Sequence, residues 1–319
     1  MLVMAGAVAQ AQQPNKVRRI GYLSSADAIS ESTRLEAILL ALRNLGYTEG
    51  QNIAFERIYA KGKLERHSEL AAGLVRRKVE IIVVLGGTLW VRAAKNATKT
   101  IPIVMVGTGS DPVETGLIES LARPGGNVTG FSSLNPELST KRLEILKDVV
   151  PKLARVGFLQ QPGALGPVDR TLKDLTAAAL ALKLKMTAIE TEAGAKGLES
   201  AFQTAKQKQM GAIMTGSGRV FFAERRRIVE LAGKHRFPAI YFQSEFVDDG
   251  GLMSYGVDYT DLYRRAAVYV DKILKGAKPG DLPVQQATKF EFVINLKAAK
   301  QIGLTIPARV LERANKVIK

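Results

Sequence analysis

The feature that most constrains this chain is an alternation of short apolar runs with longer stretches whose apolar residues recur at helical spacing. The run at 81–85 is apolar at every position, which is typical of a central parallel strand covered by helices on both faces. Leu35, Ile38 and Leu42 then recur at helical spacing before Gly46, a residue suited to ending a helix. This alternation predicts an α/β fold with doubly wound parallel sheets. The expected strands cover 19–23, 80–85, 101–106, 155–159, 185–189, 212–214, 239–242 and 252–255.

The strand and helix patterns form two series, one before and one after about residue 135. A length of 319 residues is enough for two domains of ordinary size. The turn cluster at 123–127 leads into an extended stretch at 128–134, which we expect to cross between the two domains. We therefore expect two α/β lobes, and no short-period repeat is visible within them.

Composition excludes several classes of chemistry. The chain has no cysteine, which excludes disulfides, a thiol nucleophile and cysteine-ligated zinc. Its two histidines, His67 and His235, lie in charged helical stretches, so we expect neither a metal site nor a histidine-based catalytic triad. The formal net charge is +16, but basic residues are spread along the chain and no nucleic-acid-binding motif is present. We therefore expect no nucleic-acid partner, and a positive field that favours anionic solutes.

The first residues have the pattern of a secretory signal. Residues 1–11 are small, apolar and uncharged, and Ala9-Gln10-Ala11 is a cleavage-site pattern that a polar segment follows. We therefore expect 1–16 to be a residual signal peptide or disordered lead, and the mature protein to be periplasmic. No later segment offers the roughly 18 consecutive apolar residues of a membrane span, so we expect the mature chain to be soluble.

The loops that follow the strands are the expected ligand site, because ligands of open parallel sheets bind beyond the carboxyl ends of the strands. Gly86-Gly87-Thr88 opens a helix and is suited to holding an anion, although an ordinary tight turn is the alternative. Asp111 and Glu245 follow strands and are suited to accepting hydrogen bonds from a ligand. The predicted ligand-binding residues are Ser24, Ser25, Gly86, Gly87, Thr88, Asp111, Ser133, Gln161, Gly216, Ser217, Tyr241 and Glu245.

No nucleotide or cofactor motif accompanies these loops. Gly216 and Gly218 begin a dinucleotide fingerprint, but Phe221 stands where a third glycine is needed, and no P-loop occurs. We therefore expect no cofactor, no metal and no catalytic residue. Tyr22, Phe221 and Tyr241 are candidates for packing against the apolar body of a ligand, and each is also a candidate for the core.

Longer segments resemble a known family. They are RIGYLS (19–24), LGYTEGQNI (45–53), IPIV (101–104), SDPV (110–113), SLARPGGNVTG (120–130), RRIVELA (226–232), GGLMSYG (250–256), TKFEFVINLK (288–297) and IGLTIP (302–307). With these segments the chain closely resembles the ABC-transporter substrate-binding proteins of the tryptophan/tyrosine type, from about residue 17 to the end. One departure is Gln161, which precedes Pro162 where members often carry asparagine.

The resemblance implies a type I periplasmic-binding-protein fold, with two lobes joined by a three-crossing hinge and ligand in the cleft between them. The lobes would be 17–134 plus 256–285 and 135–255 plus 286–319, with crossings near Ser133, Tyr255 and Gln286. It also implies hinge closure around a small solute and delivery to ABC permease subunits in the membrane. We expect the solute to bear a carboxylate, as an amino acid or aromatic acid does, and the protein to act as a monomer.

Two other functional classes remain open from the sequence. A two-lobed α/β enzyme would need a nucleotide site, and turnover of a candidate substrate would identify it. A ligand-sensing ectodomain partner would have the same fold, and pull-down of a histidine kinase in place of a permease would identify it.

Overall fold

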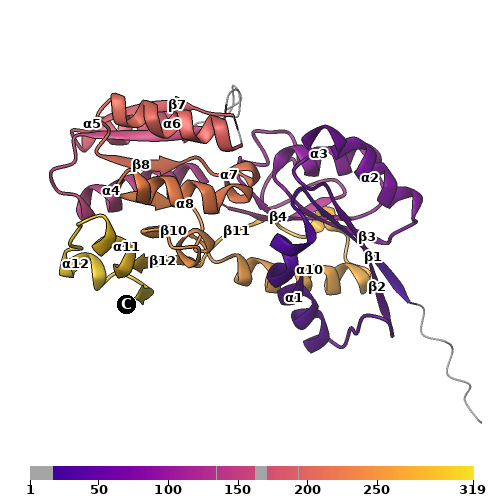
Figure 1. The fold of residues 1–319 in the computed structure, drawn as a ribbon. Helices are drawn as coiled ribbons and strands as arrows, with labels where there is room; N and C mark the ends of the chain where they lie inside the picture. The colour runs from indigo at the N-terminus through magenta and orange to yellow at the C-terminus, as the bar shows by residue number, and fades with distance from the viewer. Residues whose placement is uncertain (1–16, 134, 162–170, 193) are drawn as a thin grey trace, which may run out of the picture.

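The computed structural model describes residues 17–133, 135–161, 171–192 and 194–319, which form two α/β lobes side by side (Figure 1). The strands of the first lobe are β1 (Arg18–Ser24), β2 (Ile53–Tyr59), β3 (Ile81–Leu85), β4 (Ile103–Thr108), β5 (Val128–Ser132) and β11 (Gln285–Gln286). Its helices are α1 (Ala28–Asn44), α2 (His67–Arg76), α3 (Thr88–Ala97) and α10 (Tyr259–Leu274), with short 3-10 turns η1 (Leu64–Arg66) and η2 (Pro279–Asp281). These strands pair in parallel in the order β11-β5-β4-β3-β1-β2.

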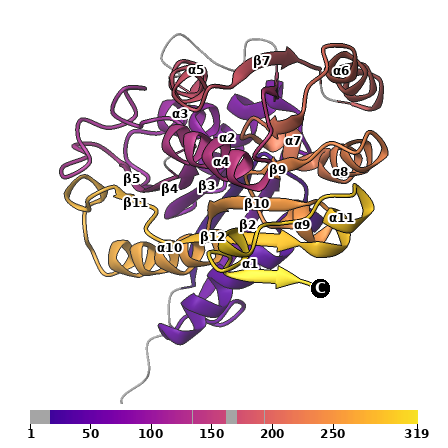
Figure 2. The same ribbon diagram turned by 90° about the vertical axis from the view of Figure 1, so that its left-hand side faces the viewer.

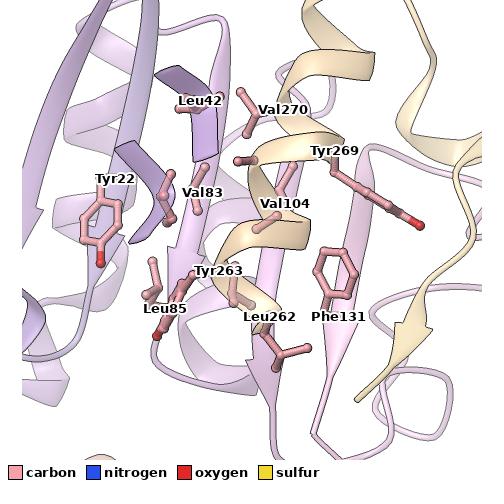
Figure 3. Packing of buried hydrophobic residues seen from close by; sticks show 14 of the residues in the cluster. Tyr22, Leu42, Val83, Leu85, Val104, Phe131, Leu262, Tyr263, Tyr269 and Val270 are labelled. Carbon is pink, nitrogen blue, oxygen red and sulfur yellow. The ribbon is translucent and has the colours of Figure 1, made fainter. Parts of the chain in front are cut away.

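Helices cover both faces of this first sheet, which explains why β3 is apolar and buried at every position. On one face, α10 from late in the chain packs against α1 and the sheet (Figure 3). Tyr263, Val83 and Val104 are all fully buried there. On the other face lie α2 and α3, and they approach so closely that a side chain on Gly21 would lie 3.1 Å from Leu74.

The second lobe is built on a seven-stranded sheet. Its strands are β6 (Arg155–Gln160), β7 (Lys185–Glu190), β8 (Ala212–Thr215), β9 (Ala239–Tyr241), β10 (Met253–Val257), β12 (Phe290–Asn295) and β13 (Lys316–Ile318). Its helices are α4 (Asn135–Val149), α5 (Thr171–Ala181), α6 (Ala195–Gln207), α7 (Arg219–Ala223), α8 (Arg225–Lys234), α9 (Glu245–Asp248), α11 (Leu296–Gln301) and α12 (Ala308–Leu311). Figure 2 shows α4 and α5 on one side of this sheet and α6 and α8 on the other.

The strand order of the second sheet is β13-β12-β10-β9-β8-β6-β7. All of its pairs are parallel except β10 with β12, which run antiparallel. The predicted doubly wound parallel architecture is therefore confirmed, with one antiparallel pair where the chain re-enters this lobe.

The two sheets repeat one topology. The order β2-β1-β3-β4-β5 in the first lobe corresponds to β7-β6-β8-β9-β10 in the second. The loop after β3 and the loop after β8 therefore hold equivalent places in their lobes. Figure 1 shows α7, which follows β8, on the side of its lobe that adjoins the first.

The chain passes between the sheets three times, after β5, after β10 and after β11. The first passage includes residue 134, which lies outside the described residues. Pairing in β10 continues to Val257, so the second passage lies just beyond the Tyr255 of the sequence-based boundary. The third lies between Gln286 and Phe290. None of the helices in the described ranges is long and apolar enough to cross a membrane.

Candidate ligand-binding site between the lobes

The turn between β3 and α3 lies at the carboxyl end of the first sheet and contains two glycines, Gly86 and Gly87. Gly87 caps α3 with φ +86° and no side-chain hydrogen bond, and the neighbouring Gly86 has φ +151°. A side chain on Gly86 would lie 2.7 Å from Trp90 Cδ1 and 2.9 Å from Ser25 Oγ. Only glycine fits there, because the backbone passes directly against both residues.

Ser25 supplies a hydroxyl group beside this turn. Its N–H donates to the Leu85 carbonyl at 3.0 Å, which joins the loop after β1 to the end of β3. The side chain is 1% exposed, and its Oγ has no hydrogen-bond partner among the described residues. The first N–H groups of α3 also lack intrahelical acceptors, and the helix dipole makes that end positive. Ser25 and the turn before Thr88 therefore form a corner rich in hydrogen-bond donors.

Two other predicted site residues, Ser24 and Ser133, are buried at the same end of the sheet and take part in its loops. Ser24 Oγ accepts a hydrogen bond from the Ala26 N–H at 3.1 Å. Ser133 donates both its N–H and its hydroxyl to the Thr108 carbonyl, each at 2.9 Å. Their polar groups hold the ends of β1 and β5 in place.

Asp111, another predicted site residue, does not offer a free carboxylate to a ligand. Asp111 is exposed and accepts hydrogen bonds from Val113 N–H at 2.7 Å and Glu114 N–H at 3.4 Å. Its carboxylate therefore caps its own turn. Gln161 is half-buried directly after β6, and it adjoins residues 162–170, which lie outside the description.

Tyr241 lies in the core of the second lobe. It is 1% exposed, and its ring stacks on Phe246 with centroids 4.7 Å apart. Burial raises the pKa of its phenol above the ordinary value. Tyr241 also lines a cavity of about 340 Å³ with Gly251 and Leu252, between α8 and α11. The candidates Tyr22 and Phe221 are likewise core residues, 0% and 4% exposed.

A buried arginine of the first lobe, Arg34, contacts the second. Arg34, on α1, is 5% exposed, and its Nη2 lies 2.9 Å from Glu245 Oε1 and 3.3 Å from Gln243 Oε1. Its guanidinium also lies 4.5 Å from the centre of the Phe222 ring. Glu245, predicted from the loop after β9, is thus placed at the junction of the lobes, in an ion pair that joins them.

Within its own lobe Arg34 is backed by a buried acid. Glu31 is 0% exposed, with its Oε1 at 3.4 Å from Arg34 Nη1, and it accepts a hydrogen bond from Tyr22 at 2.9 Å. Burial works against the charge of Arg34, but the coulombic influence of Tyr263, Glu245 and Glu31 outweighs it and raises the pKa above its ordinary value. Two carboxylates, Glu31 and Glu245, therefore lie on one guanidinium.

A second buried arginine, Arg142, contacts the loop that follows β8. Arg142, on α4, is 1% exposed and donates to the Tyr255 carbonyl at 3.1 Å, to Ser139 Oγ at 2.7 Å and to Ser217 Oγ at 3.3 Å. Burial lowers its pKa to about 10. Next to Ser217, the Gly216 N–H donates to the Leu159 carbonyl at 2.7 Å, so this loop is fixed on both sides.

The sequence reasoning missed Arg34 and Glu31, although a pattern was present. On α1 both occupy the same helical stripe as Ile38 and Leu42, and all four are buried. Charged residues on an apolar stripe indicate a buried ion pair or a site. Phe222 was next to the candidate Phe221, and Gln243 lay two residues from both Tyr241 and Glu245. Arg142 lay in a helix whose sequence gave no sign of a site.

The sequence profile of the family described as "ABC transporter substrate binding protein" matches residues 25–318. The chain belongs to this family. Members are solute-binding proteins and not enzymes, so the enzyme alternative is excluded. The family implies a small-molecule ligand, a membrane permease as partner and a place of action outside the cytoplasm.

Individual relatives cover most of the chain. It is 28% identical over 301 residues to the "Tyrosine-binding protein" of Clostridioides difficile (strain R20291), covering 91% of this chain and 82% of the relative. A conserved domain protein from Vibrio cholerae has a TM-score of 0.85 at 28% identity, covering 95% of this chain and 100% of that one. An ABC domain from Streptococcus pneumoniae in complex with L-Trp has a TM-score of 0.84 at 26% identity, with the same coverage. These matches confirm the predicted family and fold.

Proposed function

We propose that this substrate-binding protein is the solute-capturing subunit of an ABC importer. Its solute is a small carboxylate-bearing molecule, an amino acid or aromatic acid, which it holds between the lobes and delivers to the permease. The observation that carries the proposal is the unpartnered, buried hydroxyl of Ser25 beside the open N-terminus of α3. The relatives named for tyrosine and bound to L-Trp support the same class of solute.

The carboxylate of the solute lies on the Gly86-Gly87-Thr88 turn in this proposal. That turn follows the fully buried strand β3, near the middle of the first sheet. Free N–H groups, the helix dipole and the Ser25 hydroxyl all favour an anion there, and the net positive charge of the chain adds to them.

In this proposal the ammonium group of an amino acid lies at the cluster formed by Arg34, Glu31 and Glu245. Two carboxylates, Glu31 and Glu245, lie on one guanidinium, and the partly exposed Glu245 has a second oxygen that can accept a hydrogen bond from an ammonium group. Phe222 and Tyr259 flank the guanidinium at 4.5 and 5.3 Å and offer apolar surface to the body of the solute. Because these groups come from both lobes, binding favours closure about the three crossings.

A thermal-shift screen tests this function. A ligand that binds only the native state stabilises it by RT ln(1 + [L]/Kd), so amino and aromatic acids should raise the melting temperature. Native mass spectrometry of protein purified from its host should detect such an acid carried with it. A rise with sugars or nucleosides, and none with any amino or aromatic acid, would show that the solute class is wrong.

The location is a further part of the proposal. We infer a periplasmic protein that is cleaved after Ala11 and acts as a monomer. N-terminal sequencing of native protein should begin at Gln12, and light scattering should give the mass of one chain. An intact Met1 on cytoplasmic protein would contradict the location.

A further inference from the structure

Arg142 is a buried cation whose contacts in the described residues are all with neutral groups. It is 1% exposed, and among the described residues no carboxylate forms an ion pair with it. Its two Nη groups donate only to neutral oxygens, and its Nε has no hydrogen-bond partner. A buried charge is costly unless it is paired, so a guanidinium in this state needs a reason to be there.

The position of Arg142 places that charge at the boundary of the lobes. It donates to Ser217, which follows β8, and β8 holds the same place in the second sheet as β3 holds in the first. Ser217 is therefore the second-lobe counterpart of the turn at Gly86–Thr88. Arg142 also donates to the carbonyl of Tyr255 in β10, the strand after which the chain passes to the first lobe.

The contact between Arg142 and Ser217 sets the polarity of the hydroxyl. Ser217 Oγ accepts the hydrogen bond from Arg142 Nη2 at 3.3 Å, so its own O–H is left to donate. Ser217 is half-buried, and no acceptor for this proton is found among the described residues. A donor with a positive charge behind it selects an anion and rejects a cation.

We propose that Arg142 and Ser217 form the second-lobe half of the carboxylate site. This inference rests on the proposed function and deepens it. Ser217 contacts the carboxylate, and Arg142 is a positioning residue that orients Ser217 and supplies the counter-charge. A carboxylate has two oxygens and about four lone-pair sites, so it can accept donors from both lobes at once. Closure of the lobes is then tied to the presence of the anion.

The experiment compares an acid with its amide. Calorimetry gives the affinities of L-tryptophan and L-tryptophanamide, which share the ring and the ammonium but differ in the carboxylate. The wild type should prefer the acid, and Arg142→Gln should reduce that preference by roughly tenfold to a hundredfold, the range for hydrogen bonds to charged groups. Arg142→Lys should keep part of it, because the charge remains. Arg226→Ala is the control, since that side chain is 80% exposed.

A second measurement separates ligand binding from a structural role. Without ligand, Arg142→Gln should keep or raise the urea midpoint of unfolding, because it removes an unpaired buried charge. An undiminished preference for the acid in Arg142→Gln, or a urea midpoint that falls steeply, would overturn the inference. If the wild type binds neither compound, the proposed solute class fails, and the urea midpoint still decides whether Arg142 is structural.

Discussion

The ion pair between Arg34 and Glu245 should set how readily the lobes close. It joins α1 of the first lobe to α9 of the second at 2.9 Å. Glu245→Gln removes the charge but keeps a hydrogen-bond acceptor, and it leaves Arg34 paired with the buried Glu31. The substitution therefore weakens the contact between the lobes without leaving a buried charge unpaired.

The expected loss of closure depends on how far solvent screens the ion pair between Arg34 and Glu245. A hydrogen bond between charged groups contributes about 1.5–3 kcal/mol. Glu245 is 37% exposed, so solvent screening places this one at the lower end, and glutamine keeps part of it. We expect closure to weaken by about 1 kcal/mol, which is roughly fivefold in the closed-to-open ratio. The apparent affinity should fall by at least this factor, because Glu245 also faces the ammonium group of the solute in the proposed site.

The chain itself provides the assay. Because it has no cysteine, Leu40→Cys on α1 and Leu180→Cys on α5 give one labelling site in each lobe. Both leucines are exposed, 58% and 79%. Single-molecule energy transfer should show more open molecules for Glu245→Gln than for the wild type.

The matched control is Asp248→Asn. Asp248 is on the same short helix as Glu245, but it pairs at 3.7 Å with Lys316 of its own lobe. If Glu245→Gln and Asp248→Asn have the same distance distribution and the same affinity as the wild type, the pair does not govern closure and the reasoning fails.

Three further predictions concern the site and stability. Thr88→Val should weaken solute binding by roughly five- to tenfold in calorimetry, because it removes a polar group at the α3 turn, while Arg226→Ala should leave binding unchanged. Gly86→Ala should lower the free energy of unfolding in urea by about 1–3 kcal/mol, because its Cβ would meet Trp90 at a strained φ. Burial and nearby lysines lower the pKa of His235 below its ordinary 6.5, so the neutral ring favours folding. Stability should be full above pH 6.5 and fall as the pH drops below it, and His235→Asn should flatten this part of the urea stability profile.

Strong periodicity made most of the fold predictable from the sequence. The run at 81–85 became β3 because five apolar residues in a row can be satisfied only between two helical layers. β2 was missed because Glu56 and Arg57 interrupt it, and as an edge strand it needs only one buried face. The pair β10 with β12 depends on how the chain returns from a crossing, which no local pattern records.

The candidate site was predictable only in part. The rule that loops at carboxyl ends form the site pointed to Ser25, the turn at Gly86 and Glu245. The structure brings Ser25 against the turn at Gly86 and places Glu245 in an ion pair between the lobes. Tyr241 was a candidate for packing against the apolar body of the ligand, but its ring lies in the core against Phe246. The roles of the two buried arginines depend on which helix faces meet, and that is a property of tertiary packing.

The central claim is that an amino or aromatic acid binds between the lobes, and one titration tests it most directly. The protein is unfolded in urea to remove any carried solute, refolded, and titrated with L-tryptophan and L-tyrosine in a calorimeter. We predict saturable binding of at least one of them with one site per chain, weakened by Thr88→Val and unaffected by Arg226→Ala. Binding that is as strong in Thr88→Val as in the wild type, or no binding of any amino or aromatic acid, would contradict the account.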